Sequence, residues 1–161
     1  MPSAYFESLA ARLDYPIFVV TVASATERDG CLVGFTTQSS VDPPRFIVCL
    51  SDKNRTFRIA SEADVMIVHL VPADAFELAE LFGSQTGDDV DKFERCPWSR
   101  GPEGTPVLAD CPTWFAGLIL ERFRAGDHWG FLLEPFDGEA ASGGEYLTFQ
   151  RAKVLEPGHE A

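Results

Sequence analysis

Short apolar segments, each rich in β-branched or aromatic residues and each ended by turn residues, constrain the fold of this chain most strongly. The first covers residues 17–25. Glu27-Arg28-Asp29-Gly30 is expected to form the hairpin turn after it, because Asp-Gly is a strong turn signal. Residues 31–40 then return as a second strand, and Asp42-Pro43-Pro44 interrupts pairing before a third strand over residues 45–51. Connections this short favour antiparallel neighbours.

The rest of the chain continues this pattern with few helices. Amphipathic spacing and capping residues predict helices over residues 3–13, 54–62 and 73–82. Further strands are expected over residues 64–70, 113–123, 128–136 and 145–154. A long loop over residues 83–112 lies between them, and loops of that length often serve binding.

Length and composition then limit the architecture. A chain of 161 residues is expected to form one domain, residues 1–161, with its core at about 15–154. Thirteen glycines and eleven prolines supply many turns, which favours β-structure over a helical bundle. We therefore predict a mainly antiparallel β-barrel with a few short α-helices.

The net charge of −12 argues against two classes of partner. A surface of that sign repels the phosphates of nucleic acid and the headgroups of anionic membranes. A phosphorylated ligand would need a local positive patch, and Lys53, Arg55 and Arg58 supply one against the overall charge. No apolar run reaches the length of a membrane span, and no signal peptide is recognised at the start, so the expected location is the cytoplasm.

Cysteines and acidic residues give little support for a metal site. The four cysteines include no C-x-x-C pair, and no histidine lies near one of them at the spacing of zinc ligands. No zinc site is therefore expected. Asp88, Asp89 and Asp91 begin like a calcium loop but lack the glycine and glutamate that such a loop needs. Asp88 or Asp89 is instead expected to cap the turn that contains Phe93.

Two of the three histidines can be interpreted from their surroundings. His69 lies in an apolar run and is expected to be a strand residue whose ring nitrogens are satisfied. His128, in Gly126-Asp127-His128, begins an apolar strand. It is either incidental to a turn or an imidazole that is held by Asp127 or by backbone and faces a ligand. His159 lies in the tail, where exposure is expected.

Residues 34–58 carry most of the functional signal. Small polar residues are followed by Asp42-Pro43-Pro44, an apolar strand and a polar, cationic segment in which Asn54 can cap a helix. Hydroxyls and amides of this kind can line a flat polar ring, and cations at a helix start can hold a phosphate. The alternative is that Thr36–Ser40 is only the solvated face of a strand.

The order of these motifs resembles the flavin reductase-like family, which adopts the FMN-binding split barrel. The resemblance runs from about Tyr15 to Val154. It rests on the strand FVVT, then G-F-T-T-x-S-S, D-P-P, V-C-L, N-R-T, L-A-E-L-F, D-K-F and finally G-D-H before an apolar strand. Each motif alone is weak, and their common order and spacing give the match its specificity.

The resemblance implies a set of site residues. His128 would lie beside the nicotinamide of the reduced nucleotide. The residues that would contact the flavin are Thr36, Thr37, Gln38, Ser39, Ser40, Cys49, Leu50, Ser51, Lys53, Asn54, Arg55 and Thr56, with Phe149 in an aromatic role. Gln38 and the final strand, residues 146–151, depart from the family pattern.

The resemblance also implies a function. The chain is expected to transfer a hydride from NADH or NADPH to FMN, with FAD as the other flavin, and to act as a homodimer. A role as the reductase that serves an oxygenase partner is in keeping with the resemblance. Two alternatives are a split-barrel flavoprotein whose tightly held flavin acts on another substrate, and a non-catalytic flavin-binding module.

Overall fold

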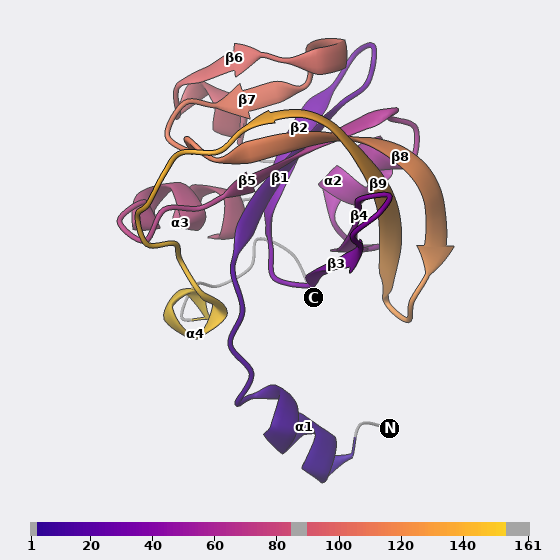
Figure 1. The fold of residues 1–161 in the computed structure, drawn as a ribbon, viewed down its shortest axis with the longest axis vertical. Coiled ribbons are helices and arrows are strands. Elements are labelled where there is room, and N and C mark those ends of the chain that lie inside the picture. The colour runs from indigo at the N-terminus through magenta and orange to yellow at the C-terminus, as the bar shows by residue number, and fades with distance from the viewer. Residues whose placement is uncertain (1–2, 85–89, 154–161) are drawn as a thin grey trace.

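The computed structural model describes residues 3–84 and 90–153, and seven of its strands form one antiparallel sheet (Figure 1). The strand order is β2-β1-β5-β8-β9-β4-β3. These strands are β1 (Phe18–Ala23), β2 (Arg28–Val33), β3 (Thr36–Ser40), β4 (Arg45–Ser51), β5 (Val65–Leu70), β8 (Trp114–Arg124) and β9 (His128–Glu139). The α-helices are α1 (Ala4–Ala10), α2 (Arg55–Ala60), α3 (Phe76–Ser84) and α4 (Phe149–Ala152). The predicted mainly β, antiparallel class with a few short helices is confirmed.

The two edge strands of the sheet, β2 and β3, are consecutive in the chain. Only Gly34 and Phe35 join Val33, the last residue of β2, to Thr36, the first of β3. Three steps between neighbouring Cα atoms span at most about 11 Å, so the two edges must approach each other at this point. The sheet therefore curls into an open barrel, with a split between β2 and β3.

The prediction of one strand over residues 31–40 is wrong in this respect. The segment breaks at Gly34, and its two halves pair on opposite edges, β2 with β1 and β3 with β4. Gly34 permits the break because a Cβ at this position would lie 2.8 Å from Tyr15 Cε1. The crossing is further fixed by the Cys49 amide, which donates to the Phe35 carbonyl at 2.9 Å.

The hairpin turn is also displaced from its predicted position. Asp29 and Gly30 lie inside β2, opposite Val22 and Thr21, and the chain reverses one turn earlier, where Ser24 N–H donates to the Glu27 carbonyl. The Asp29 side chain is buried among cationic and hydroxyl partners. In a hairpin turn this side chain would be exposed to solvent. Gly30 is needed in the strand because a Cβ there would approach the Val20 carbonyl to 2.8 Å.

Residues 145–154 do not form the predicted strand. Tyr146 and Thr148 make isolated bridges to Pro72 and Pro16, and α4 begins at Phe149. Both bridge partners are prolines, which lack the N–H that a longer ladder would need. The segment therefore links the ends of β5 and β1 and then turns into a short helix.

The segment predicted as a long loop contains its own small hairpin. β6 (Trp98–Arg100) pairs with β7 (Pro106–Leu108). The 3-10 helix η1 (Lys92–Glu94) precedes this hairpin, and the 3-10 helix η2 (Pro102–Gly104) lies in its turn. Asp91 caps η1, because its carboxylate accepts from the Phe93 amide at 3.1 Å. Asp88 and Asp89, which were expected to serve as the cap, and His159 lie outside the described residues.

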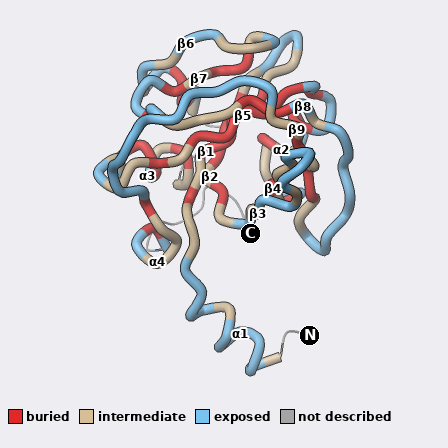
Figure 2. The backbone as a smooth tube through the Cα atoms, viewed as in Figure 1, coloured by how far each residue is buried: buried red, intermediate tan, exposed pale blue. Residues whose placement is uncertain are grey.

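Buried residues gather above all on the neighbouring strands β1 and β5 (Figure 2). One core cluster lies within the barrel and includes Val20, Val48, Leu50 and Phe131. A second joins β1 to α3 and α4 through side chains such as Phe82 and Leu147. In contrast, α1 projects from the body and buries none of its residues. No helix in the described ranges is long and apolar enough to cross a membrane.

His69 is a fully buried strand residue with both ring nitrogens paired, as predicted. Its Nδ1 lies 2.9 Å from the Val19 carbonyl, and its Nε2 accepts from the Leu108 amide at 3.0 Å. Nδ1 is therefore the protonated nitrogen of a neutral ring. Burial lowers the pKa of His69 from 6.5 to about 4, because the charged form would be desolvated.

This shift predicts a pH-dependent loss of stability. The unfolded chain binds the His69 proton more tightly, so the free energy of unfolding should fall by about 3 kcal/mol as the pH drops from 6.5 to 4. Urea unfolding at several pH values would measure this decline. His69→Gln should flatten the curve over this range, while His128→Gln serves as the control. Equal slopes in wild type and His69→Gln would contradict the assignment.

Candidate functional site

The candidate site centres on the loop of residues 51–56, which includes the last residue of β4 and the first two residues of α2. Ser51 pairs with His128 at the end of the β4–β9 ladder, and the Asp52 amide donates to the Asp127 carbonyl at 3.1 Å. The β8–β9 turn, in which Gly126 adopts a φ of 101°, therefore lies directly against this loop. Two segments that the sequence singled out separately are brought together.

His128 is held by Asp127, which is one of the arrangements that the sequence left open. The distance from His128 Nδ1 to Asp127 Oδ1 is 2.7 Å, and the His128 side chain is 21% exposed. The hydrogen bond from His128 is the main cause that lowers the pKa of Asp127, with a smaller contribution from the charge of Lys53. An ionised Asp127 only accepts, so Nδ1 donates to it and Nε2 is left for other partners.

The backbone amides of the loop are largely occupied within the protein. The Lys53 amide donates to Ser51 Oγ at 3.3 Å, and the Thr56 amide donates to the Asn54 side chain at 2.9 Å. Asn54 thus caps α2 as predicted. The amides of Asp52, Asn54 and Phe57 donate to main-chain carbonyls. Backbone amides at a helix start can bind a phosphate only where they are not already engaged. Because five of them are engaged, side chains would have to supply most anion contacts.

Arg55 takes part in an internal charge cluster. Its guanidinium contacts Glu27 at 3.3 Å, Asp29 at 3.5 Å and the Arg28 carbonyl at 3.2 Å. Asp29 also accepts from Thr56 Oγ1 at 3.0 Å and lies 3.9 Å from the buried ammonium group of Lys92. This arrangement ties β2 to α2 and to η1. Asp29 was missed as a site-supporting residue because its charged partners lie 26 or more positions away in the sequence.

The polar strand β3 forms an exposed edge beside β4, the strand that leads into this loop. Thr37, Gln38 and Ser39 are exposed, while Thr36 and Ser40 are half-buried. β3 pairs only with β4, and Gln38 lies opposite Phe46. Hydroxyls and strand-edge backbone groups are thus accessible along one side of the split.

The β4 residues of the predicted set differ in their accessibility. Cys49 is half-buried, whereas Leu50 is 1% exposed and belongs to the barrel core. Ser51 is buried and binds the Lys53 amide. Lys53 itself is exposed, at the rim of the loop. Of this group, Cys49 and Lys53 are accessible to a ligand, and Leu50 and Ser51 support the loop from within.

A row of aromatic rings leads from Phe149 to His128. Tyr15 stacks on Phe149 with centroids 4.8 Å apart, Phe35 lies 6.5 Å from Tyr15, and His128 lies 5.1 Å from Phe35. Phe149 therefore reaches His128 only through two other rings. Phe35 was not among the predicted residues, although a large apolar residue between Gly34 and a polar run could have drawn attention to it.

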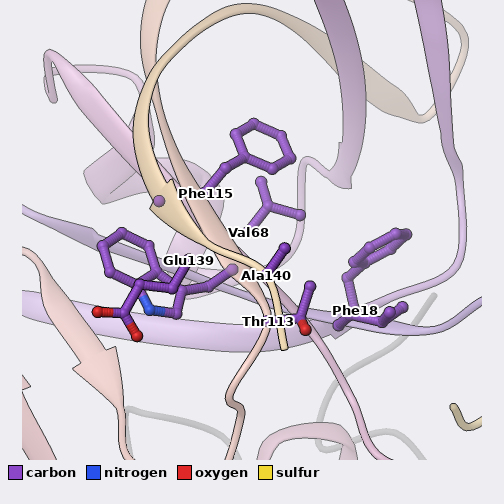
Figure 3. A pocket seen from close by; sticks show the side chains of 9 residues that line it. Phe18, Val68, Thr113, Phe115, Glu139 and Ala140 are labelled. Carbon is purple, nitrogen blue, oxygen red and sulfur yellow. The ribbon is translucent and has the colours of Figure 1, made fainter. Parts of the chain in front are cut away.

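An open apolar pocket of about 450 Å³ lies at the other end of β9 (Figure 3). Phe18, Val68, Thr113, Phe115, Glu139 and Ala140 are among the residues that line it. None of its nine lining residues belongs to the predicted flavin-binding set. Its rings of Phe18 and Phe115 both pack on Phe46, which pairs with Gln38, so the pocket adjoins the predicted site without containing it.

The family is established by a match over most of the chain. Residues 10–156 match the family described as "Flavin reductase like domain". The chain belongs to this family.

Individual relatives agree with the family assignment. The flavin reductase-like chain is 27% identical over 162 residues to a Variovorax paradoxus protein named "FMN reductase (NADH) RutF", covering 99% of this chain and 89% of that protein. It is 28% identical over 134 residues to a Rhizobium meliloti protein named "Probable flavin reductase", covering 80% of this chain and 42% of the relative. For that protein and a second from R. meliloti, of which 57% is covered, the chain spans about half of the relative's length.

A solved structure supports the fold. The flavin reductase domain protein from Arthrobacter sp. FB24 superposes with a TM-score of 0.82 at 21% identity, over 98% of this chain and 94% of that one. Among the described residues of the flavin reductase-like chain, no group of three or more His, Cys, Asp or Glu side chains could hold a metal ion.

The charge cluster behind the loop predicts a large effect of one carboxylate on stability. Asp29→Asn should lower the free energy of unfolding by about 3 kcal/mol, because Lys92 and Arg55 would lose their buried counter-charge. Asp91→Asn is the matched control. Its ion pair with Arg28 is exposed and asparagine can still cap η1, so the loss should stay below about 1 kcal/mol. Urea unfolding would compare them, and equal losses would contradict a structural role for Asp29.

Proposed function

We propose that this domain transfers a hydride from NADH or NADPH to a flavin, with FMN as the preferred flavin and FAD as the alternative. One observation carries the proposal: β4, the strand that leads into residues 51–56, lies between β3 with its exposed polar edge and β9, which begins at the Asp127–His128 pair. In a family named for flavin reductases, this arrangement offers separate surfaces for a flavin and for a nucleotide.

The residues at this edge fit a flavin. A flavin presents a flat ring with polar edges, a hydroxylated ribityl chain and a terminal phosphate. Thr36, Thr37, Gln38, Ser39 and Ser40 provide hydroxyl, amide and strand-edge groups along one line, which suits the ring edge and the ribityl chain. Cys49 would lie beside the ring, and Leu50 and Ser51 would support it from within the protein. Lys53 is the exposed cation at the end of this line, and Asn54, Arg55 and Thr56 shape the loop around it.

The proposed hydride transfer requires little acid or base catalysis by the protein. The bound flavin would supply the hydride acceptor, and the nicotinamide would supply the hydride. The chain's own contribution would be to hold the two rings in contact and to keep water away from them. His128 would bind at the nicotinamide side through Nε2, because Asp127 fixes its other nitrogen.

A homodimer is the proposed assembly. Tyr5, Phe6 and Leu9 of α1 are 81%, 58% and 54% exposed, and Leu120 and Phe123 of β8 are also exposed. A second copy would remove this apolar surface from water, and the α1 helix of seven residues is too short to be stable without packing. A mass in solution near 17.7 kDa, that of one chain, would contradict this assembly.

An oxygenase that consumes the reduced flavin is the proposed partner in the cell. A Rhizobium relative, 24% identical over 153 residues, is named "FADH(2)-dependent resorcinol hydroxylase, reductase component". An exposed flavin edge on β3 would allow release of the reduced product to such a partner. The cytoplasmic location stays a prediction from the sequence.

Anaerobic reduction tests the proposed function. Purified protein with FMN and either NADH or NADPH should bleach the flavin absorbance catalytically, with many flavins reduced per chain. Substitution of FAD for FMN measures the flavin preference. Bleaching of only one flavin per chain would favour the alternative of a tightly held cofactor that serves another substrate. No bleaching with either nucleotide would contradict a reductase and leave a flavin-binding module.

The phosphate contact can be tested with Lys53→Ala. This variant should raise the Kd for FMN about tenfold and leave that for riboflavin, which has no phosphate, nearly unchanged. Lys53 is preferable to Arg55 for this test, because removal of Arg55 would also break its ion pairs with Glu27 and Asp29. Lys153→Ala, with the same change in charge just after α4, is the control. Equal weakening of both flavins in Lys53→Ala would exclude a phosphate contact.

A further inference from the structure

Phe35 is an exposed aromatic residue at the one place where the chain crosses the split. Its side chain is 54% exposed, although the residue lies between two strands and only two positions after buried Val33. Its main chain is nevertheless fixed, because its carbonyl accepts from the Cys49 amide at 2.9 Å. An exposed but firmly held phenyl ring is a surface on which another flat ring can stack.

The neighbours of Phe35 support this ring from one side. Tyr15 lies 6.5 Å away with the ring planes at 54°, and Tyr15 itself is stacked on Phe149 at 22°. The Phe149 amide donates to the Tyr15 carbonyl at 2.8 Å, and Gly34 packs against the Tyr15 ring. Phe35 therefore has a rigid backing, and movement of its ring away from the split is restricted.

The imidazole of His128 stands beside the same ring. The two centroids are 5.1 Å apart with the planes tilted at 52°, so the rings form the sides of a corner rather than a stack. Asp127 holds the imidazole by its Nδ1. The corner thus combines an apolar face from Phe35 with a polar ring nitrogen, His128 Nε2, which is the chemistry needed to bind a ring that carries a carboxamide.

We propose that Phe35 is the stacking platform of the nicotinamide subsite, and that with His128 it determines the affinity for the nicotinamide nucleotide. This inference rests on the proposed reductase function and assigns the aromatic role to Phe35 rather than to Phe149. Phe149 acts indirectly, as a positioning residue that supports Tyr15 and through it Phe35. Because β3 and Lys53 provide the flavin contacts, the platform should affect the nucleotide far more than the flavin.

The test measures binding separately from turnover. Calorimetric titration of the FMN-saturated protein with the oxidised nucleotide, which donates no hydride, gives its Kd for wild type, Phe35→Ala, Phe35→Leu and Phe35→Tyr. Phe35→Ala should raise this Kd at least about fivefold, in line with the loss of one ring stack. Leucine should not restore affinity, because it has no π face, whereas tyrosine should restore it. The Kd for FMN should change less than about twofold in all three variants.

Phe76→Ala, which removes a partly exposed ring from α3, is the control and should leave both Kd values unchanged. An unchanged nucleotide Kd in Phe35→Ala, or a rise in the FMN Kd in its place, would overturn the inference while wild-type reductase activity stands. Failure of the wild type to reduce flavin with either nucleotide would instead overturn the proposed function. The two failures are therefore distinguishable.

Discussion

The two-residue connection between β2 and β3 is the constraint on which the rest of the structure depends. Seven antiparallel strands could form an open sheet, but Gly34 and Phe35 join the first and last strands of that sheet. The short span forces the sheet to curl, and the curl brings the polar edge of β3 near the start of β1. Gly34 makes the approach sterically feasible, because any Cβ would collide with the ring of Tyr15.

The charge cluster around Asp29 holds the loop of residues 51–56 in place. The curl of the sheet places this loop at the split. Two carboxylates, Glu27 and Asp29, face the cations Arg55 and Lys92, so the cluster is close to neutral although the chain carries a net charge of −12. Buried charges are tolerated only when they are paired in this way. Arg55, which was predicted to contact a phosphate, therefore helps to hold β2, α2 and η1 together. Lys53, exposed at the rim of the loop, is the cation that we propose for a ligand's phosphate.

Local signals in the sequence predicted local structure well. The Asn54 cap, the strand over residues 45–51, the buried His69 and the Asp127–His128 pair each depend on neighbours in sequence or on a simple apolar pattern. The errors arose where distant residues decide the outcome. Asp29-Gly30 looks like a turn unless Lys92 and Arg55 are known to bind the carboxylate. The final strand was expected because its apolar pattern does not reveal that its partners would be Pro16 and Pro72.

The same distinction explains why the proposed nicotinamide subsite is the harder half of the candidate site to predict. Phe35 becomes significant only when the barrel curls and places it against His128, which is 93 positions later in the chain. In the linear sequence, Phe149 was the more natural candidate, since it lies in the segment where the family pattern led us to expect an aromatic residue. The structure connects both residues through Tyr15, so the aromatic support on the final segment and the exposed ring at the split belong to one continuous row. A departure from the family pattern in the last segment is thus compatible with an intact aromatic wall, because the ring nearest His128 comes from the β2–β3 crossing.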